Sequence, residues 1–239
     1  MAERQDLVRQ VRAYVEEYMN KFDGSHDFNH IKRVVGIAHV IFTGIAAPTA
    51  GSDPSSARPL DPTIITLAAM LHDVGDRKYL KEGQDPKTQV QELLLSFGAD
   101  AKLAAKVQAI CLGVSYTSEV QDPAHVRHLI MEHPELAVVQ DADRLDAIGA
   151  VGIGRVFTYG GARTDRDMHE SIDMMDRKLF KIASMMKTEP GKRMAGEATH
   201  RLRLFRNWWR EEMGHEQLGL SVLGPAAGEE DAARIETSG

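Results

Sequence analysis

The sequence has few of the features that would mark a secreted or membrane-bound protein. It contains one cysteine, Cys111, so an internal disulfide is excluded and a reducing compartment is favoured. Apolar neighbours at helical spacing predict that Cys111 is a buried structural thiol. No apolar run reaches the length of a membrane span, and the first ten residues lack the apolar core of a signal peptide. We therefore expect a soluble, cytoplasmic protein that does not contact a membrane.

An excess of basic charge is also missing. The 29 Lys and Arg residues are outnumbered by 35 Asp and Glu residues, which gives a formal net charge of −6. A long nucleic acid is bound through a basic face, because its phosphates have to be neutralised. The charge therefore argues against a long nucleic acid as partner, whereas a small phosphorylated molecule remains compatible with it.

Alternation of apolar and polar residues, typical of strands, is absent as well. Apolar residues instead recur at steps of three and four. This spacing predicts helices over residues 7–18, 27–41, 63–73, 85–97, 103–114, 136–159, 174–186 and 194–209, with the Gly160–Gly161 pair ending the sixth. The length and an apolar content of 43% suffice for one sizeable core. We predict an all-α, single-domain fold over residues 1–220, with seven or more helices.

Two segments lack helical periodicity. Residues 46–62 are dense in Pro, Ser, Gly and Ala and contain no aromatic residue, which predicts a mobile loop insertion. Residues 221–239 are rich in Gly, Ala and Glu, and we expect them to form a disordered tail.

The most informative feature is the pair His72–Asp73, which follows the apolar run Leu67–Leu71. An imidazole and a carboxylate buried together need a partner, and a divalent cation is a good one. His30 and Asp143 offer two more ligands of the same types. Four such ligands leave two positions of an octahedral ion open, which suits Mn²⁺ best, with Mg²⁺, Fe²⁺ or Zn²⁺ as alternatives. Water bound to such an ion is activated, so hydrolysis of a phosphate ester or anhydride is the expected chemistry.

Three segments resemble the HD-domain superfamily of metal-dependent phosphohydrolases: SHDFNHIKRV, LAAMLHDVGDRKY and VQDADRLDAIGAVGIGR. The run DADRLDAIGAxGI is similar to small soluble HD nucleotide pyrophosphohydrolases. The resemblance extends from about residue 20 to about residue 213 and implies an HD-domain helical bundle. It places the metal ligands at His30, His72, Asp73 and Asp143. It also implies cleavage of a nucleoside triphosphate to the monophosphate and pyrophosphate. The loop at 46–62 and Gly75 depart from the usual pattern and leave the choice of substrate open.

Further candidates surround these ligands. Asp76 is the candidate general base, Lys78 is a candidate phosphate-binding cation, and His26 could contact phosphate or orient a ligand. The ordinary alternatives are a solvated charge cluster after the helix for Asp76 and Lys78, and helix capping for His26. Asp146, one turn after Asp143, could support a ligand, while Arg144 is expected to pair with Asp141 or Asp27.

Other functions are compatible with the same residues. A nucleotidase or a phosphodiesterase would use the same metal centre. A non-catalytic nucleotide-sensing HD module, or a helical interaction protein with a decayed site, would keep the fold. The expected partner is a small-molecule nucleotide. For Trp208–Trp209 we expect at least one ring in the core, with the other exposed or at the contact of a homodimer.

Overall fold

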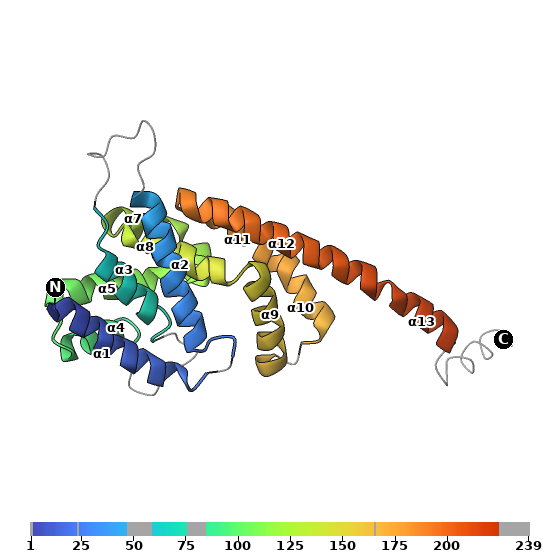
Figure 1. Ribbon diagram of the computed structural model, residues 1–239, viewed down its shortest axis with the longest axis horizontal. Helices are drawn as coiled ribbons and strands as arrows, with labels where there is room; N and C mark the ends of the chain where they lie inside the picture. Colours follow the sequence, from blue (N-terminus) through green and yellow to red (C-terminus); the bar gives the residue numbers. More distant parts are fainter. Residues whose placement is uncertain (1, 23, 47–58, 76–84, 165, 225–239) are drawn as a thin grey trace. The chain divides into compact units, whose positions relative to one another are not determined.

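The computed structural model describes residues 2–22, 24–46, 59–75, 85–164 and 166–224. All regular structure within these ranges is helical and none is strand, which confirms the predicted all-α fold (Figure 1). The chain divides into two compact units, Met1–Leu202 and Arg203–Gly239, which are described separately.

The described residues form helices in the following order along the chain. The first unit contains α1 (Ala2–Met19), α2 (Phe28–Ala46), α3 (Pro62–Leu71), α4 (Gln89–Ser96), α5 (Ala101–Val114), α6 (Tyr116–Gln121), α7 (Pro123–Glu132), α8 (Glu135–Asp146), α9 (Gly149–Arg163), α10 (Met168–Met174), a π-helical turn (Met175–Leu179), α11 (Phe180–Ile182) and a 3₁₀ turn (Ala183–Met185). Helix α12 (Glu189–Met213) belongs to both units, and α13 (His215–Leu223) belongs to the second. The sequence analysis missed α6, α7 and α13.

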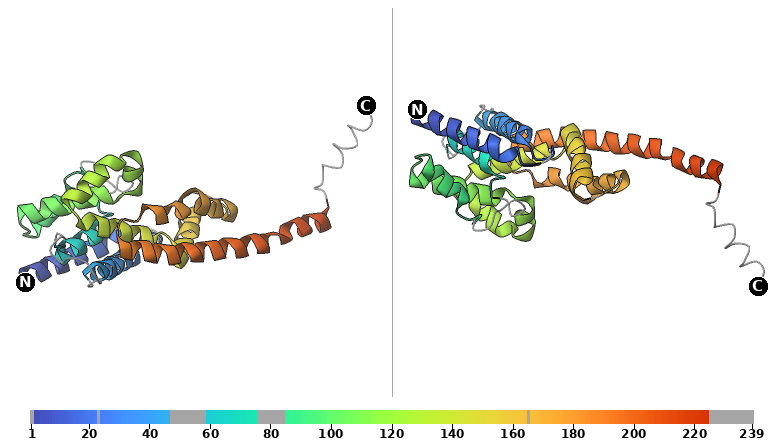
Figure 2. Two further views of the ribbon diagram at one scale, coloured as in Figure 1. Left: turned by 90° about the horizontal axis from the view of Figure 1, so that it is seen from above. Right: turned by 90° about the horizontal axis from the view of Figure 1, so that it is seen from below.

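Helix α3 shows how local sequence signals build the core. The Asp61 side chain accepts hydrogen bonds from the backbone N–H groups of Thr63 (2.8 Å) and Ile64 (3.4 Å), and Pro62 takes the first helical position. Seven of the ten residues of α3 are buried. Helix α2 packs against both α3 and α8, and the three helices lie side by side in Figures 1 and 2. These three helices carry the predicted metal ligands.

The predicted continuous helix over residues 136–159 is wrong. Helix α8 ends at Asp146, and α9 starts at Gly149. Gly149 adopts a φ of 69°, a left-handed conformation that disfavours any residue with a Cβ, and a Cβ there would lie 3.3 Å from Cβ of Ala198. The Gly160–Gly161 pair does not end α9, which continues to Arg163 because glycine costs helix stability without forbidding the helix.

Residues 47–58, most of the predicted insertion, lie outside the described residues, between the end of α2 and the start of α3. Of the predicted tail, residues 221–223 belong to α13, while residues 225–239 are not among those described. Trp208 and Trp209 lie in the second unit, and the expectation that at least one of their rings is in the core is wrong. Trp208 is 57% exposed, and Trp209 is only half-buried, with its ring 6.2 Å from that of Phe205.

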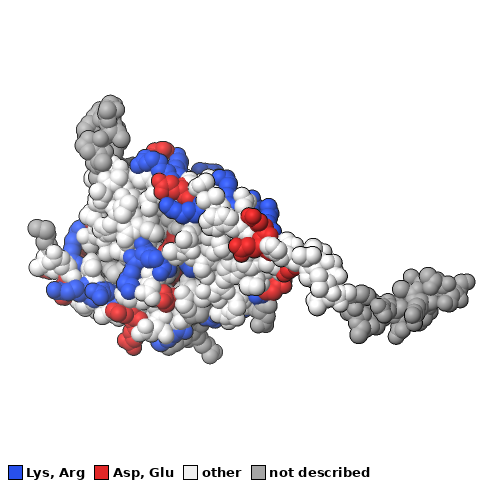
Figure 3. Space-filling model, turned by 45° about the vertical axis from the view of Figure 1, so that its right-hand side comes forward, with Lys and Arg blue, Asp and Glu red and all other residues white. Residues whose placement is uncertain are grey.

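Cys111 is buried, as predicted. Within the described part of the chain, no helix combines the length and the apolar character that crossing a bilayer requires. On the face drawn in Figure 3, Lys and Arg side chains alternate with Asp and Glu side chains. Positive charge on this face is therefore dispersed and does not form a continuous basic surface.

Candidate metal centre

His30 occupies the third position of α2, where the helix start fixes its backbone. The Asp27 side chain accepts a hydrogen bond from the His30 backbone N–H at 3.1 Å and so caps this helix. The His30 side chain is only 1% exposed. Its Nδ1 atom lies 2.7 Å from Oδ2 of Asp146, so Nε2 faces the opposite way, toward α3.

His72 and Asp73 lie where α3 ends and the chain turns. His72 is the C-terminal cap residue, and its Nδ1 donates to the backbone carbonyl of Ala69 at 2.9 Å. Gly75 adopts a φ of 84° in the following turn, and a Cβ there would lie 2.9 Å from Oε1 of Gln89. Glycine at this position thus allows the tight turn that holds His72 and Asp73 at the end of the apolar helix α3.

The fourth predicted residue, Asp143, comes from the last turn of α8. Nε2 of His30 and Nε2 of His72 are 3.3 Å apart, and Oδ1 of Asp143 is 3.6 Å from each. Oδ2 of Asp73 is 3.4 Å from Nε2 of His30, and Oδ1 of Asp73 is 3.5 Å from Nε2 of His72. Residues separated by more than one hundred positions are therefore brought together by the packing of α2, α3 and α8.

The electrostatics of this group favour a positive partner. Burial opposes protonation of His72, but the carboxylates of Asp73 and Asp143 outweigh burial and raise the pKa of His72 to about 9. Burial opposes ionisation of Asp73 and Asp143, yet the nearby imidazoles hold the pKa of each carboxyl below its usual range. Two carboxylates thus remain charged in a largely buried setting, where a cation between them would be strongly attracted.

The donor set fits a divalent metal ion. Bonds of about 2.0–2.4 Å at tetrahedral or octahedral angles place neighbouring ligand atoms roughly 3–4 Å apart, and all five separations given above fall in this range. Ligand atoms of His30, His72 and Asp73 all lie within 4.8 Å of one another. Oδ2 of Asp73 is buried and has no hydrogen-bond donor among the residues that the structure describes. The side chains of Asp73 and Asp143 are 19% and 26% exposed, so the group opens to solvent on its carboxylate side.

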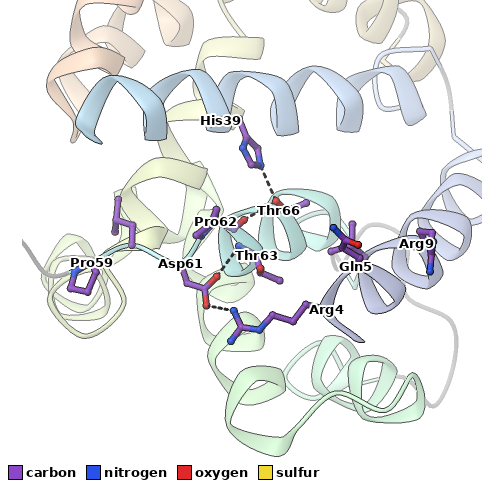
Figure 4. A pocket seen from close by; sticks show the side chains of 11 residues that line it. Arg4, Gln5, Arg9, His39, Pro59, Asp61, Pro62, Thr63 and Thr66 are labelled. Carbon is purple, nitrogen blue, oxygen red and sulfur yellow. Dashed lines mark hydrogen bonds and ion pairs between the residues drawn. The ribbon is translucent and has the colours of Figure 1, made fainter. Parts of the chain in front are cut away.

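A second hollow, of about 920 Å³, lies at the other end of α3 (Figure 4). Its polar side chains bind one another: Arg4 bonds Asp61 at 2.8 Å, and His39 bonds Thr66 at 2.8 Å. None of the predicted site residues lines it. We place the candidate site at the His–Asp group rather than in this hollow, because the His–Asp group brings the ligand atoms of His30, His72 and Asp73 within 4.8 Å of one another.

Comparisons with known proteins agree with the geometry. No family model matches the chain. The uncharacterized protein YpgQ of Bacillus subtilis is 28% identical over 194 residues, which cover 79% of this chain and 84% of YpgQ. A crystal structure of YpgQ in complex with ADP matches with a TM-score of 0.64 and 27% identity over 89% of this chain and 96% of YpgQ. An HD-superfamily hydrolase from Bacillus thuringiensis matches with a TM-score of 0.63 and 25% identity over 88% of this chain and 98% of that protein.

The fold match supports membership of the HD superfamily. It agrees with the resemblance found in the three sequence segments around His30, His72–Asp73 and Asp143.

Three further residues, Asp76, Lys78 and His26, were predicted to take part in the site. Asp76 and Lys78 lie outside the described residues. His26 is half-buried, and its ring lies 6.0 Å from that of His30 and 5.9 Å from that of Tyr159. Its Nδ1 is 2.7 Å from the hydroxyl of Ser25. The Asp27 side chain accepts from the first turn of α2, and a role of His26 toward phosphate or a ligand stays a prediction.

Two arginines behind the candidate metal centre were not foreseen from the sequence, and a third pairs with a different residue from the one predicted. Arg33 of α2 and Arg155 of α9 both bond Asp146, the carboxylate behind His30. Arg144, predicted to pair with Asp141 or Asp27, is buried against Glu119 of α6. Asp141 instead accepts hydrogen bonds from the backbone N–H groups of Lys187 and Thr188. The sequence did offer a hint of Arg33, because this residue lies three positions after His30 and shares its helix face.

Proposed function

We propose that this protein is a metal-dependent phosphohydrolase that acts on nucleotides and converts a nucleoside triphosphate to the monophosphate and pyrophosphate. The observation that carries the proposal is the convergence of His30, His72, Asp73 and Asp143 at mutual distances that fit one divalent ion. The likeness to an HD-superfamily hydrolase supports hydrolysis, and the ADP complex of YpgQ supports a nucleotide as ligand.

The four side chains supply the charge and the geometry that such a centre requires. His30 and His72 each turn Nε2 inward, because Nδ1 of each is engaged by Asp146 and by the carbonyl of Ala69, respectively. Once an ion displaces the proton of His72, two carboxylates and two neutral imidazoles carry a net charge of −2, which matches a divalent cation. A divalent cation held there would lower the pKa of a coordinated water and polarise a phosphoryl oxygen. We propose Mn²⁺ as the native ion.

The exposed side of the group is the natural entrance for the phosphate chain. Asp73 and Asp143 are partly exposed there, while both imidazoles are buried. His26, next to the ring of His30, is our candidate for contacting a phosphate oxygen, since an imidazole can donate a hydrogen bond to it. We also propose Asp76 as general base and Lys78 as a cation for the phosphates.

The test is hydrolysis of a panel of nucleoside mono-, di- and triphosphates with Mn²⁺ and with a chelator. Release of pyrophosphate from triphosphates is the expected result, together with loss of activity in Asp143→Asn. Release of inorganic phosphate from monophosphates would instead indicate a nucleotidase. Metal-dependent nucleotide binding without turnover would contradict an enzymatic role and favour a nucleotide-sensing module.

A further inference from the structure

Behind the candidate metal centre lies a buried carboxylate held by three residues. Asp146, the last residue of α8, is 2% exposed. Its Oδ2 accepts from Nδ1 of His30 at 2.7 Å and from Arg155 Nη1 at 3.0 Å. Arg33 donates from Nε to Oδ1 at 2.6 Å and from Nη2 to Oδ2 at 3.1 Å. The carboxylate thus joins α2, α8 and α9 at a point directly behind one proposed ligand.

The direction of these bonds determines where the proton of His30 lies. An ionised carboxylate can only accept hydrogen bonds, so Nδ1 of His30 must be the donor. The lone pair of the neutral ring is then on Nε2, the atom that faces His72, Asp73 and Asp143. We propose that Asp146 is a positioning residue, which holds His30 in the tautomer and orientation that metal binding requires. This inference rests on the metal centre of the proposed function.

The two arginines explain how Asp146 stays ionised and fixed. A buried carboxylate is stable only when it is paired and hydrogen-bonded. Arg33 grips both oxygens in the bidentate manner that guanidinium and carboxylate favour. Arg155 is anchored separately, because its Nε donates to the carbonyl of Ser25 at 2.8 Å. Arg155 is therefore held at two points and Arg33 engages both oxygens, which together limit rotation of the carboxylate.

The conservative variant Asp146→Asn tests the tautomer directly. The asparagine amide must place its NH₂ group either at the Oδ2 position, facing Nδ1 of His30, Nη1 of Arg155 and Nη2 of Arg33, or at the Oδ1 position, facing Nε of Arg33. In the first arrangement Nδ1 becomes an acceptor, and the proton moves to Nε2, where it blocks metal binding. In the second arrangement two donors face each other, and the clamp opens. Both outcomes weaken the metal site while leaving the size of the side chain nearly unchanged.

The experiment measures Mn²⁺ affinity of the full-length, chelator-stripped protein by calorimetric titration. We expect Mn²⁺ to bind Asp146→Asn about 10–100-fold more weakly than wild type. Asp141→Asn is the matched control: Asp141 is equally buried on α8, but its bonds are to Lys187 and Thr188 rather than to His30. It should lose stability without a comparable loss of Mn²⁺ affinity. Circular dichroism of each metal-free variant checks that it folds.

An Mn²⁺ affinity of Asp146→Asn within about twofold of wild type would overturn the inference. If this variant does not fold, Arg33→Gln, at a partly exposed position, replaces it, and unchanged affinity there would be equally decisive. Wild-type protein that binds none of Mn²⁺, Mg²⁺, Fe²⁺ and Zn²⁺ would refute both the metal centre and the inference. Wild-type protein that binds Mn²⁺ but hydrolyses no nucleotide would refute the proposed function alone.

Discussion

Replacing Asp73 by alanine should separate metal binding from folding. Asp73 lies within 3.5 Å of Nε2 of both His30 and His72, and one of its oxygens is buried without a donor among the described residues. Alanine removes the cost of burying that charge together with its contacts to the imidazoles. We therefore expect Asp73→Ala to keep its helical content but to bind Mn²⁺ poorly.

The size of the effect follows from linkage between binding and folding. Mn²⁺ at 100 times its Kd stabilises wild type by about 2.7 kcal/mol. At about 2–4 °C per kcal/mol for a domain of this size, Tm rises by roughly 5–11 °C. If loss of the Asp73 carboxylate weakens binding about 100-fold, the same Mn²⁺ concentration only equals Kd. The stabilisation is then about 0.4 kcal/mol, and the rise in Tm falls to about 1–2 °C.

Differential scanning calorimetry with chelator and with Mn²⁺ measures both quantities. Asp173→Ala is the control, since Asp173 is an exposed carboxylate whose side chain pairs with Arg177 at 3.4 Å. It should show the full wild-type response to Mn²⁺. An equal rise in Tm for Asp73→Ala and wild type would refute the assignment of Asp73, and a wild-type protein insensitive to Mn²⁺, Mg²⁺, Fe²⁺ and Zn²⁺ would refute the whole centre.

Three further predictions concern the surrounding fold. Glu119→Ala leaves the buried guanidinium of Arg144 unpaired and should cost about 3 kcal/mol in urea unfolding at neutral pH. Burial opposes ionisation of Glu119, but its two cationic neighbours outweigh burial and lower its pKa, so wild type should lose this stabilisation as the pH falls below about 4.5 while the variant does not. Gly149→Ala should cost about 1–2 kcal/mol because of its positive φ, whereas Gly154→Ala, with no atom near the added Cβ, should not lower Tm. Burial raises the pKa of Cys111, so this thiol should resist alkylation in native protein and react once urea unfolds it; rapid native labelling would contradict its buried position.

The positions of the helices could be predicted where apolar residues repeat, but not where one helix passes into the next. The break between α8 and α9 depends on the φ of Gly149 and on its close approach to Ala198, and neither is visible in periodicity. At Gly160–Gly161 the sequence predicted a helix end that does not exist, since α9 continues through both glycines. A glycine marks a helix end only when its backbone leaves the helical region, and that is decided by packing rather than by residue type.

The sequence also did not show which residues pair with the buried charges. Arg144 lies three residues after Asp141 on one helix, yet it pairs with Glu119 from α6, a helix that the sequence analysis did not identify. Arg33 lies three residues after His30 on the same helix face, but its contact with Asp146, which is 113 residues away in the sequence, depends on how the helices pack. Which cation meets which carboxylate depends on how helices cross, and short-range spacing holds little information about crossing.

The four candidate ligands could be singled out from the sequence for a physical reason: they lie at or near helix ends. His30 is in the first turn of α2, His72 caps the end of α3, and Asp143 is in the last turn of α8. The middle of each helix can therefore be apolar and form the core, while its end carries a polar residue to a common point. In the sequence, this arrangement appears as an apolar run that ends at His72–Asp73. The sequence indicated that Asp146, one turn after Asp143, could support a ligand, but only the packing of the helices shows that the side chain it contacts is His30.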